Sequence, residues 1–424
     1  MRKSLAAVLL LASAAPAAAE SVVVTADRMI DVLTGRVIEE PVVVITDGRI
    51  ASVVGRGGGR PNIPADARRI DLPGKTLLPG LIDMHVHLDS NPRYGGYSGL
   101  QFTDSFWTAQ GVGNARDMLQ AGFTTVRNVG SENYSDVGYK QAIDEGLIEG
   151  PRIVPAAYAL GATGGHCDQT YLPPSFKARS EGVGDGPQAL RAKVREQRKY
   201  GAEVIKVCAT GGVFSRNTEP GQQQLSEEEL RAIADEAHQW GLKVAAHAHG
   251  ASGIKAAIRA GIDTIEHASL IDAEGIRLAK EHGTWLDMDI FNTEYTQAEG
   301  AKNGVLEDNL RKDREVAQIQ RDNFRAAHKA GVKMLFGTDA GVMPHGTAGG
   351  QFRWMVQYGM TPMEAIQAAT RNAAQALGRE KDVGAIAVGR YGDIIAVDGD
   401  PLRDVSALED VDVVIKAGQI VKND

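Results

Sequence analysis

The sequence predicts an α/β protein, in which a (β/α)8 barrel of the TIM type carries a small β-sandwich domain built from both chain ends. Through the middle of the chain, short apolar strand candidates alternate with amphipathic helical patterns, and eight such strands are typical of the barrel. Both ends instead show β-branched runs broken by glycine and proline turns. An open doubly wound sheet is the alternative. It would need a glycine-rich nucleotide fingerprint, and Gly57-Gly58-Gly59 lies in the β-rich end with no helix after it.

The first twenty residues differ from the rest of the chain. They begin with Arg2 and Lys3, continue in an apolar run and end in small residues before Glu20, which is the layout of a secretory signal peptide. The apolar run is too short to span a bilayer comfortably as an anchor. We therefore predict a signal peptide over residues 1–19 with cleavage after Ala19. The mature protein is expected to be secreted or periplasmic, without stable membrane insertion.

The mature chain divides into two predicted domains. Residues 20–76 and 382–424 form the composite β-sandwich, and residues 77–381 form the barrel. The net charge of the full sequence is -8 and no block of basic residues occurs, so nucleic acid is excluded as an expected partner. Cys167 and Cys208 are too few for a disulfide framework, and the sequence leaves open whether they pair.

Polar side chains gather where the predicted barrel strands end. His85 and His87 alternate at the end of the first strand, so their side chains point to the same side. In this fold the chemistry lies at the carboxyl ends of the strands. The predicted ends are Leu88, Gly130, Ala157, Thr210, His249, Ser269, Phe291 and Ala340. The polar residues on or beside them are His85, His87, Lys206, His247, His249, His267 and Asp339.

Each of these residues also has a purely structural interpretation. A histidine at a strand end is commonly a hydrogen-bonded core residue, and Asp339 could cap the helix that follows it. Lys206 could pair with Asp339 or Glu266, because an unpaired buried ammonium is costly. The joint occurrence of the whole set favours one cavity instead. Imidazole and carboxylate ligands suit zinc and neighbouring divalent ions.

The order H-x-H, Lys, His, His and Asp on successive strands resembles the imidazolonepropionase-like branch of the amidohydrolase superfamily, which includes Xaa-Pro dipeptidases and ochratoxin-hydrolysing enzymes. The resemblance covers nearly all of the mature chain, and it implies a homo-oligomeric hydrolase with two divalent ions, expected to be zinc. It assigns His85, His87 and Asp339 to the more buried ion. His247 and His267 would bind the second ion, and N6-carboxylated Lys206 would bridge both. The family pattern in VAAHAHG favours the first histidine, so His249 is not expected to be a ligand.

The resemblance also assigns two catalytic roles. His166, in the loop GATGGHCD, would polarise the scissile carbonyl. Asp339 would take the proton of a metal-bound hydroxide and pass it to the leaving nitrogen. If the leaving group is an amino acid, its carboxylate needs a cation or a phenol nearby. Arg216 is the first candidate, followed by Tyr171 and His345.

The expected reaction is hydrolysis of the amide bond to a C-terminal amino acid, in dipeptides or N-acyl amino acids. Xaa-Pro dipeptides are the leading substrate, and ochratoxin A carries the same kind of bond. Predicted secretion argues against cytoplasmic histidine breakdown. Two alternatives stay open: an enzyme of the same superfamily acting on cyclic amides or lactones, and a non-catalytic binding protein on this scaffold, which would lack some of the ligands.

Overall fold

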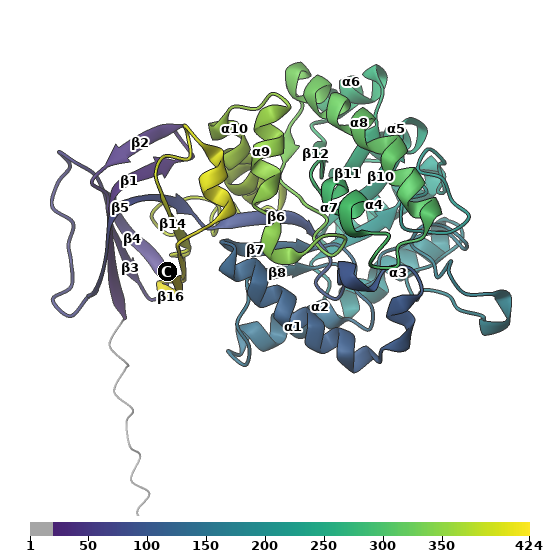
Figure 1. Cartoon of the computed structure of the whole chain (residues 1–424), viewed down its shortest axis with the longest axis horizontal. Coiled ribbons are helices and arrows are strands. Elements are labelled where there is room, and N and C mark those ends of the chain that lie inside the picture. Colours follow the sequence, from purple (N-terminus) through teal and green to yellow (C-terminus); the bar gives the residue numbers. More distant parts are fainter. Residues whose placement is uncertain (1–19) are drawn as a thin grey trace, which may run out of the picture.

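The structure is a computed structural model, and it describes residues 20–424. The predicted signal peptide lies outside the described residues. A β domain lies at one end of the molecule and a larger α/β barrel beside it (Figure 1). Across residues 20–424, no helix combines the length and the apolar character needed to cross a membrane.

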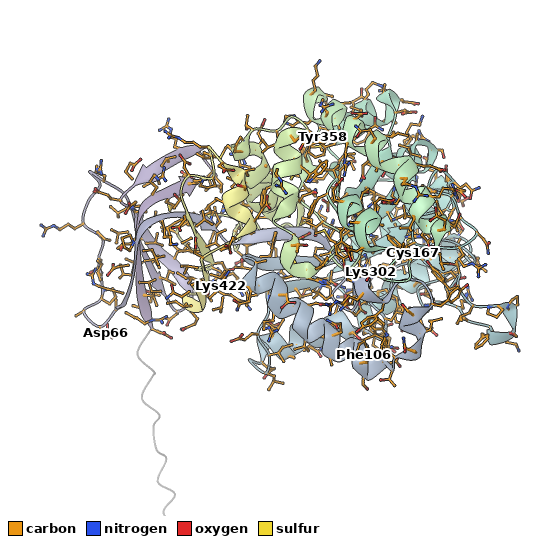
Figure 2. All side chains as sticks on the ribbon, viewed as in Figure 1. Asp66, Phe106, Cys167, Lys302, Tyr358 and Lys422 are labelled. Atoms are coloured by element: carbon orange, nitrogen blue, oxygen red, sulfur yellow. A yellow bond between two sulfur atoms is a disulfide. The ribbon has the colours of Figure 1, made fainter. Side chains whose placement is uncertain are left out.

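Both chain ends build the β domain, which confirms the prediction. The C-terminal strand β14 runs antiparallel to β5, with Ile394 opposite Pro79, and β5 runs parallel to β1. In Figure 1 the purple and yellow strands share this domain, and Figure 2 labels Asp66 and Lys422 within it. One sheet connects β1 (Ser21–Asp31), β2 (Arg36–Glu39), β3 (Val42–Thr46), β4 (Arg49–Val54), β5 (Arg68–Pro79), β14 (Ile394–Asp398), β15 (Val413–Lys416) and β16 (Gln419–Asn423).

The core of the β domain follows the two-residue period of its strands. Alternate residues turn to the same side, so Val22 and Val24 of β1 meet Val43 and Ile45 of β3 in one apolar cluster. Residues of β5, β14 and β15 complete this cluster. Strand β5 then leads almost directly into the first barrel strand.

Eight parallel strands form the barrel, as predicted. They are β6 (Leu81–Val86), β7 (Phe123–Asn128), β8 (Arg152–Pro155), β9 (Val204–Cys208), β10 (Lys243–Gly250), β11 (Thr264–Leu270), β12 (Trp285–Asp287) and β13 (Met334–Leu335). They fall into two groups, β6 to β8 and β9 to β13. Single pairings of Val86 with Ala340 and of Leu160 with Val207 join the groups on both sides and close the barrel.

Helices follow most barrel strands and surround the barrel (Figure 1). Ser226 and Glu229 form a capping box at the start of α4. The helices are α1 (Asp104–Gln120), α2 (Ser135–Asp144), α3 (Pro187–Lys199), α4 (Glu227–Gln239), α5 (Ala251–Arg259), α6 (Ala273–His282), α7 (Asn292–Glu299), α8 (Glu307–Ala330), α9 (Gly350–Gln357), α10 (Pro362–Gln367) and α11 (Ala373–Ala376).

The predicted ends of the last two barrel strands were wrong. The sequence placed them at Phe291 and Ala340, whereas β12 ends at Asp287 and β13 at Leu335. Buried apolar residues continue past both strands, so the sequence pattern does not show where the ladder stops. After β13 the chain turns, and Asp339 adopts a left-handed φ of 57° while its N–H bonds the His85 carbonyl at 2.8 Å.

Candidate metal centre

The predicted ligands meet at the carboxyl ends of the barrel strands. Asp339 Oδ1 lies 3.5 Å from His85 Nε2 and 3.4 Å from His87 Nε2. Lys206 Nζ of β9 lies 3.4 Å from His85 Nε2, and the Lys206 side chain is buried. One donor atom from each of His85, His87 and Asp339 falls within 4.8 Å of the others, so these three residues could hold one ion.

A second group of donors lies beside the first. His247, His249 and His267 each place a nitrogen within 4.8 Å of the others, and the same holds for the group of His267, Asp289 and Asp339. The ring of His267 is 4.9 Å from that of His85 between centroids. Asp339 therefore groups with His85 and His87 and also with His267, and His267 in turn groups with His247 and His249.

Fixed acceptors orient two of these histidines. His87 Nδ1 lies 3.2 Å from the Gly130 carbonyl, and His267 Nδ1 lies 2.8 Å from Asp289 Oδ1. His85 Nδ1 lies 3.2 Å from Glu266 Oε2 without forming a hydrogen bond to it. An acceptor at Nδ1 favours the tautomer that leaves Nε2 as a free ligand atom, and such partners are typical of metal-bound histidines.

Burial shifts the pKa of most of the ligands. His267 is the exception, because burial is outweighed there by the charge and hydrogen bonding of Asp289 and the charge of Asp339, which together raise its pKa. Burial, followed by the charge of Lys206, lowers the pKa of His85 well below its usual range and the pKa of His87 to about 3. Burial likewise lowers the pKa of His247 and of the Lys206 amine, and it raises the pKa of the Asp339 carboxyl. Neutral nitrogens beside a carboxylate are the donors that a divalent ion such as zinc requires, so the residues fit such an ion.

A buried ion pair near the ligands was not predicted, because the sequence suggested Glu266 only as a possible partner of Lys206 and did not single out Arg127. Arg127 of β7 donates to both Glu266 oxygens at 2.9 and 2.8 Å, and its Nη2 lies 3.4 Å from Asp287 Oδ2. Its Nε donates to the Met84 carbonyl at 2.6 Å. Arg127 thus anchors the carboxylate beside His85. A charged residue inside the apolar run FTTVRN was the available signal.

His166 lies in the loop after β8 and reaches the same cavity. Its ring stacks on that of His247 at 4.1 Å between centroids, and its Nδ1 lies 2.9 Å from Ser215 Oγ. The adjacent Cys167 forms a disulfide with Cys208 of β9, which answers the question that the sequence left open. Because Cys208 is two residues from Lys206, this bond ties the His166 loop to the strand that carries the lysine.

The three candidate carboxylate-binding residues lie in different places. Tyr171 lines the cavity that contains the ligands, a space of about 550 Å³. Arg216 lies outside the lining of that cavity, exposed, with its Nη1 2.5 Å from the Tyr97 hydroxyl. His345 is buried, and its Nε2 lies 3.1 Å from the His87 carbonyl. The structure therefore brings only Tyr171 to the cavity beside the ligands.

Similar proteins carry the same architecture. An ochratoxinase of Aspergillus niger is 34% identical over 372 residues, which cover 82% of this chain and 75% of that protein. A crystal structure of a Xaa-Pro dipeptidase with bound methionine is 36% identical, with a TM-score of 0.87 over 95% of this chain and 100% of that one. A prolidase complexed with N-methylphosphonate-L-proline is 33% identical, with a TM-score of 0.87 over 95% and 100%.

The family assignment rests on the greater part of the sequence. A sequence model of the amidohydrolase family matches residues 76–421, from the end of β5 through the barrel into β16. Its members are metal-dependent hydrolases, and the donors at the barrel mouth are those that such an enzyme needs. The chain therefore belongs to the amidohydrolase family and is a hydrolase of amide or peptide bonds.

Proposed function

We propose that the protein is a dinuclear amidohydrolase that releases the C-terminal amino acid from dipeptides or N-acyl amino acids. The observation that carries this proposal is that Asp339 groups with His85 and His87 and also with His267, which in turn groups with His247. Lys206 lies beside them, 3.4 Å from His85. A non-catalytic protein on this scaffold would have no reason to keep the full set. All the ligands that the family pattern requires are present.

The two groups would hold two zinc ions. His85, His87 and Asp339 would bind one ion, and His247 and His267 the other. Lys206 would bridge them after its amine has added carbon dioxide to form a carbamate. Burial favours this reaction because it lowers the pKa of the amine and so supplies the neutral, nucleophilic form. When bound, the ions supply an activated water and polarise the substrate carbonyl.

The remaining chemistry belongs to side chains of the chain itself. Asp339 lies beside both donor groups, where its carboxylate would accept the proton of the attacking water and deliver it to the leaving nitrogen. Burial raises the pKa of this carboxyl, which suits a group that takes and returns a proton. His166 would donate a hydrogen bond to the carbonyl oxygen. The disulfide holds the loop of His166 in place. The backbone N–H of His166 also donates a hydrogen bond to Gln224 Oε1 at 2.8 Å.

Similarity supports the substrate class. The relatives named above are an ochratoxinase, a Xaa-Pro dipeptidase and a prolidase. Xaa-Pro dipeptides and ochratoxin A both carry an amide bond to a C-terminal amino acid. We propose Xaa-Pro dipeptides as the leading substrates and ochratoxin A as a second one. The test is amino-acid release by the zinc-loaded mature protein from Xaa-Pro dipeptides, N-acyl amino acids and ochratoxin A. Release from none of them, with metal bound, would contradict the proposal and favour cyclic amides or lactones.

We also propose that the protein acts outside the cytoplasm after cleavage behind Ala19. The Cys167–Cys208 disulfide supports this location, because such bonds persist in oxidising compartments and are rare in the cytosol. N-terminal sequencing of the protein from the extracytoplasmic fraction should begin at Glu20. A full-length chain confined to the cytoplasm would refute the proposed export.

A further inference from the structure

A second cavity opens beside the candidate metal centre. It encloses about 530 Å³ and shares lining residues with the first cavity, among them His87, Glu132, Tyr171 and Phe214. The two cavities are therefore parts of one cleft. A substrate whose scissile amide lies at the metal ligands would place one of its two halves in the second cavity.

The walls of this second cavity are aromatic. The rings of Tyr94 and Trp107 meet edge to face at 5.8 Å. The Tyr171 hydroxyl lies 3.3 Å from Asn309 Oδ1, so this ring is also held in place. Fixed rings favour a bulky or planar apolar group. The aromatic residues of the wall are Tyr94, Trp107, Tyr158, Tyr171, Phe214 and Tyr295.

The carboxylates around the second cavity have no basic counterpart. Asp89, Asp104 and Glu132 line it, and among the described residues no lysine or arginine does. Asp89 Oδ2 is occupied, because it accepts bonds from the Ser131 hydroxyl at 2.7 Å and from the Glu132 N–H at 3.0 Å. Glu132 Oε1 accepts from Gln169 Nε2 at 2.5 Å, which leaves Oε2 for a ligand. Of these three carboxylates, Glu132 alone also lines the first cavity, which contains the metal ligands.

The sign of these charges orients the substrate. The free carboxylate of an amino-acid leaving group would meet like charges in the second cavity, and like-charge contacts are a common way to reject a ligand. A neutral or cationic acyl group meets no such repulsion. The first cavity is also lined by carboxylates, but it contains the ligands of the two proposed ions, whose positive charge would offset them. The acyl half would therefore lie between the aromatic walls, and the amino-acid half would lie in the first cavity.

We propose that the second cavity is an acyl-side subsite for aromatic groups that are neutral or positively charged. In it, Glu132 binds the α-ammonium of a dipeptide and so sets a preference for dipeptides over N-acyl amino acids that lack the charge. This inference rests on the proposed function, because it assumes that the enzyme releases a C-terminal amino acid.

The test compares three substrates that differ in one substituent. Phenylalanyl-proline carries an ammonium beside the scissile carbonyl, 3-phenylpropionyl-proline carries hydrogen there, and 2-benzylmalonyl-proline carries a carboxylate. At pH 7, below the usual α-amino pKa of about 7.7–8.0, the wild-type zinc enzyme should cleave the first about tenfold better in kcat/KM than the second, as a charge-assisted hydrogen bond allows. The third should be the poorest substrate.

Glu132→Gln should reduce the ratio of the first two kcat/KM values to about one. Its matched control is Glu228→Gln, on the exposed first turn of α4, which should keep the wild-type ratio. Equal cleavage of all three substrates by the wild type, or an unchanged ratio in Glu132→Gln, would overturn the subsite while leaving the hydrolase intact. Absence of proline release from all three would instead count against the proposed function and remove the basis of the subsite.

Discussion

The β domain and the barrel mouth are both buried, but they bury different chemistry. The β domain encloses valine, isoleucine and leucine, with Leu77 and Ile45 almost fully inaccessible. The barrel mouth encloses Arg127, Lys206 and Glu266, which are also almost fully inaccessible. Apolar burial stabilises a fold, whereas buried ion pairs often contribute less than apolar residues of the same volume. We therefore infer that the buried charges of the barrel interior serve the metal site. Mutations of the metal ligands should mainly change metal binding and kcat, whereas mutations in the β domain should mainly change stability.

The largest effect is expected at Lys206. Lys206→Ala should lose most bound zinc and more than about 100-fold in kcat, beyond what loss of a supporting partner costs. Added propionate should restore part of the zinc content and part of kcat, because its carboxylate can occupy the position of the lysine carbamate. Metal analysis and kcat of the purified variant measure this outcome, with Lys243→Ala at the exposed start of β10 as the control. A fully metallated, active Lys206→Ala protein would show that Lys206 does not bridge the two ions.

Arg127→Ala should be the most destabilising change in the barrel. It would leave Glu266 and Asp287 buried without their cation, and breaking a buried pair from one side costs about 3–5 kcal/mol. Denaturant unfolding of the metal-free protein measures the loss. The double variant Arg127→Met/Glu266→Gln should lose less than the sum of the two single changes. Additive losses would show that the pair is not coupled.

Leu77→Ala should act on stability alone. It removes a fully buried side chain of β5 from the apolar core of the β domain, which costs about 2–5 kcal/mol of unfolding free energy. The kcat and zinc content of the folded variant should match the wild type at a temperature well below its Tm. A large loss of kcat at full metal occupancy would show that the β domain shapes the site directly.

The smallest of these effects is expected at Asp289. Asp289→Asn removes the charged acceptor that lies 2.8 Å from His267 Nδ1, and such outer partners typically contribute about 10–100-fold to metal affinity. Competition with a chelator should show that one ion is weakened more than the other. Asp322→Asn on the exposed side of α8 serves as the control, and equal affinities in wild type and Asp289→Asn would exclude the orienting role.

The sequence predicted the features that repeat locally or recur in a fixed order. Strand and helix alternation indicated the barrel, and the spacing of His85 and His87 placed both on one side of a strand. Features that depend on distant partners were not predictable in this way. Arg127 contacts Glu266 across the barrel interior, and the disulfide joins the loop after β8 to the end of β9, which only the closed barrel brings together.

The ends of β12 and β13 were also not predictable from the local sequence pattern. The apolar run continues through Met288 and Ile290, which are buried although they lie outside the ladder. Burial alone therefore does not distinguish a strand from the loop that packs after it. Asp339 gains its position from the turn that follows β13, where its N–H bonds the backbone of β6.

A zinc titration of the metal-free mature protein tests the dinuclear centre most directly. Bound metal and proline release from a Xaa-Pro dipeptide would be followed together at each addition. We expect no proline release without metal, and a rise in the rate of release that levels off at two bound ions per chain. Full activity without metal, or a plateau at a single bound ion, would contradict it.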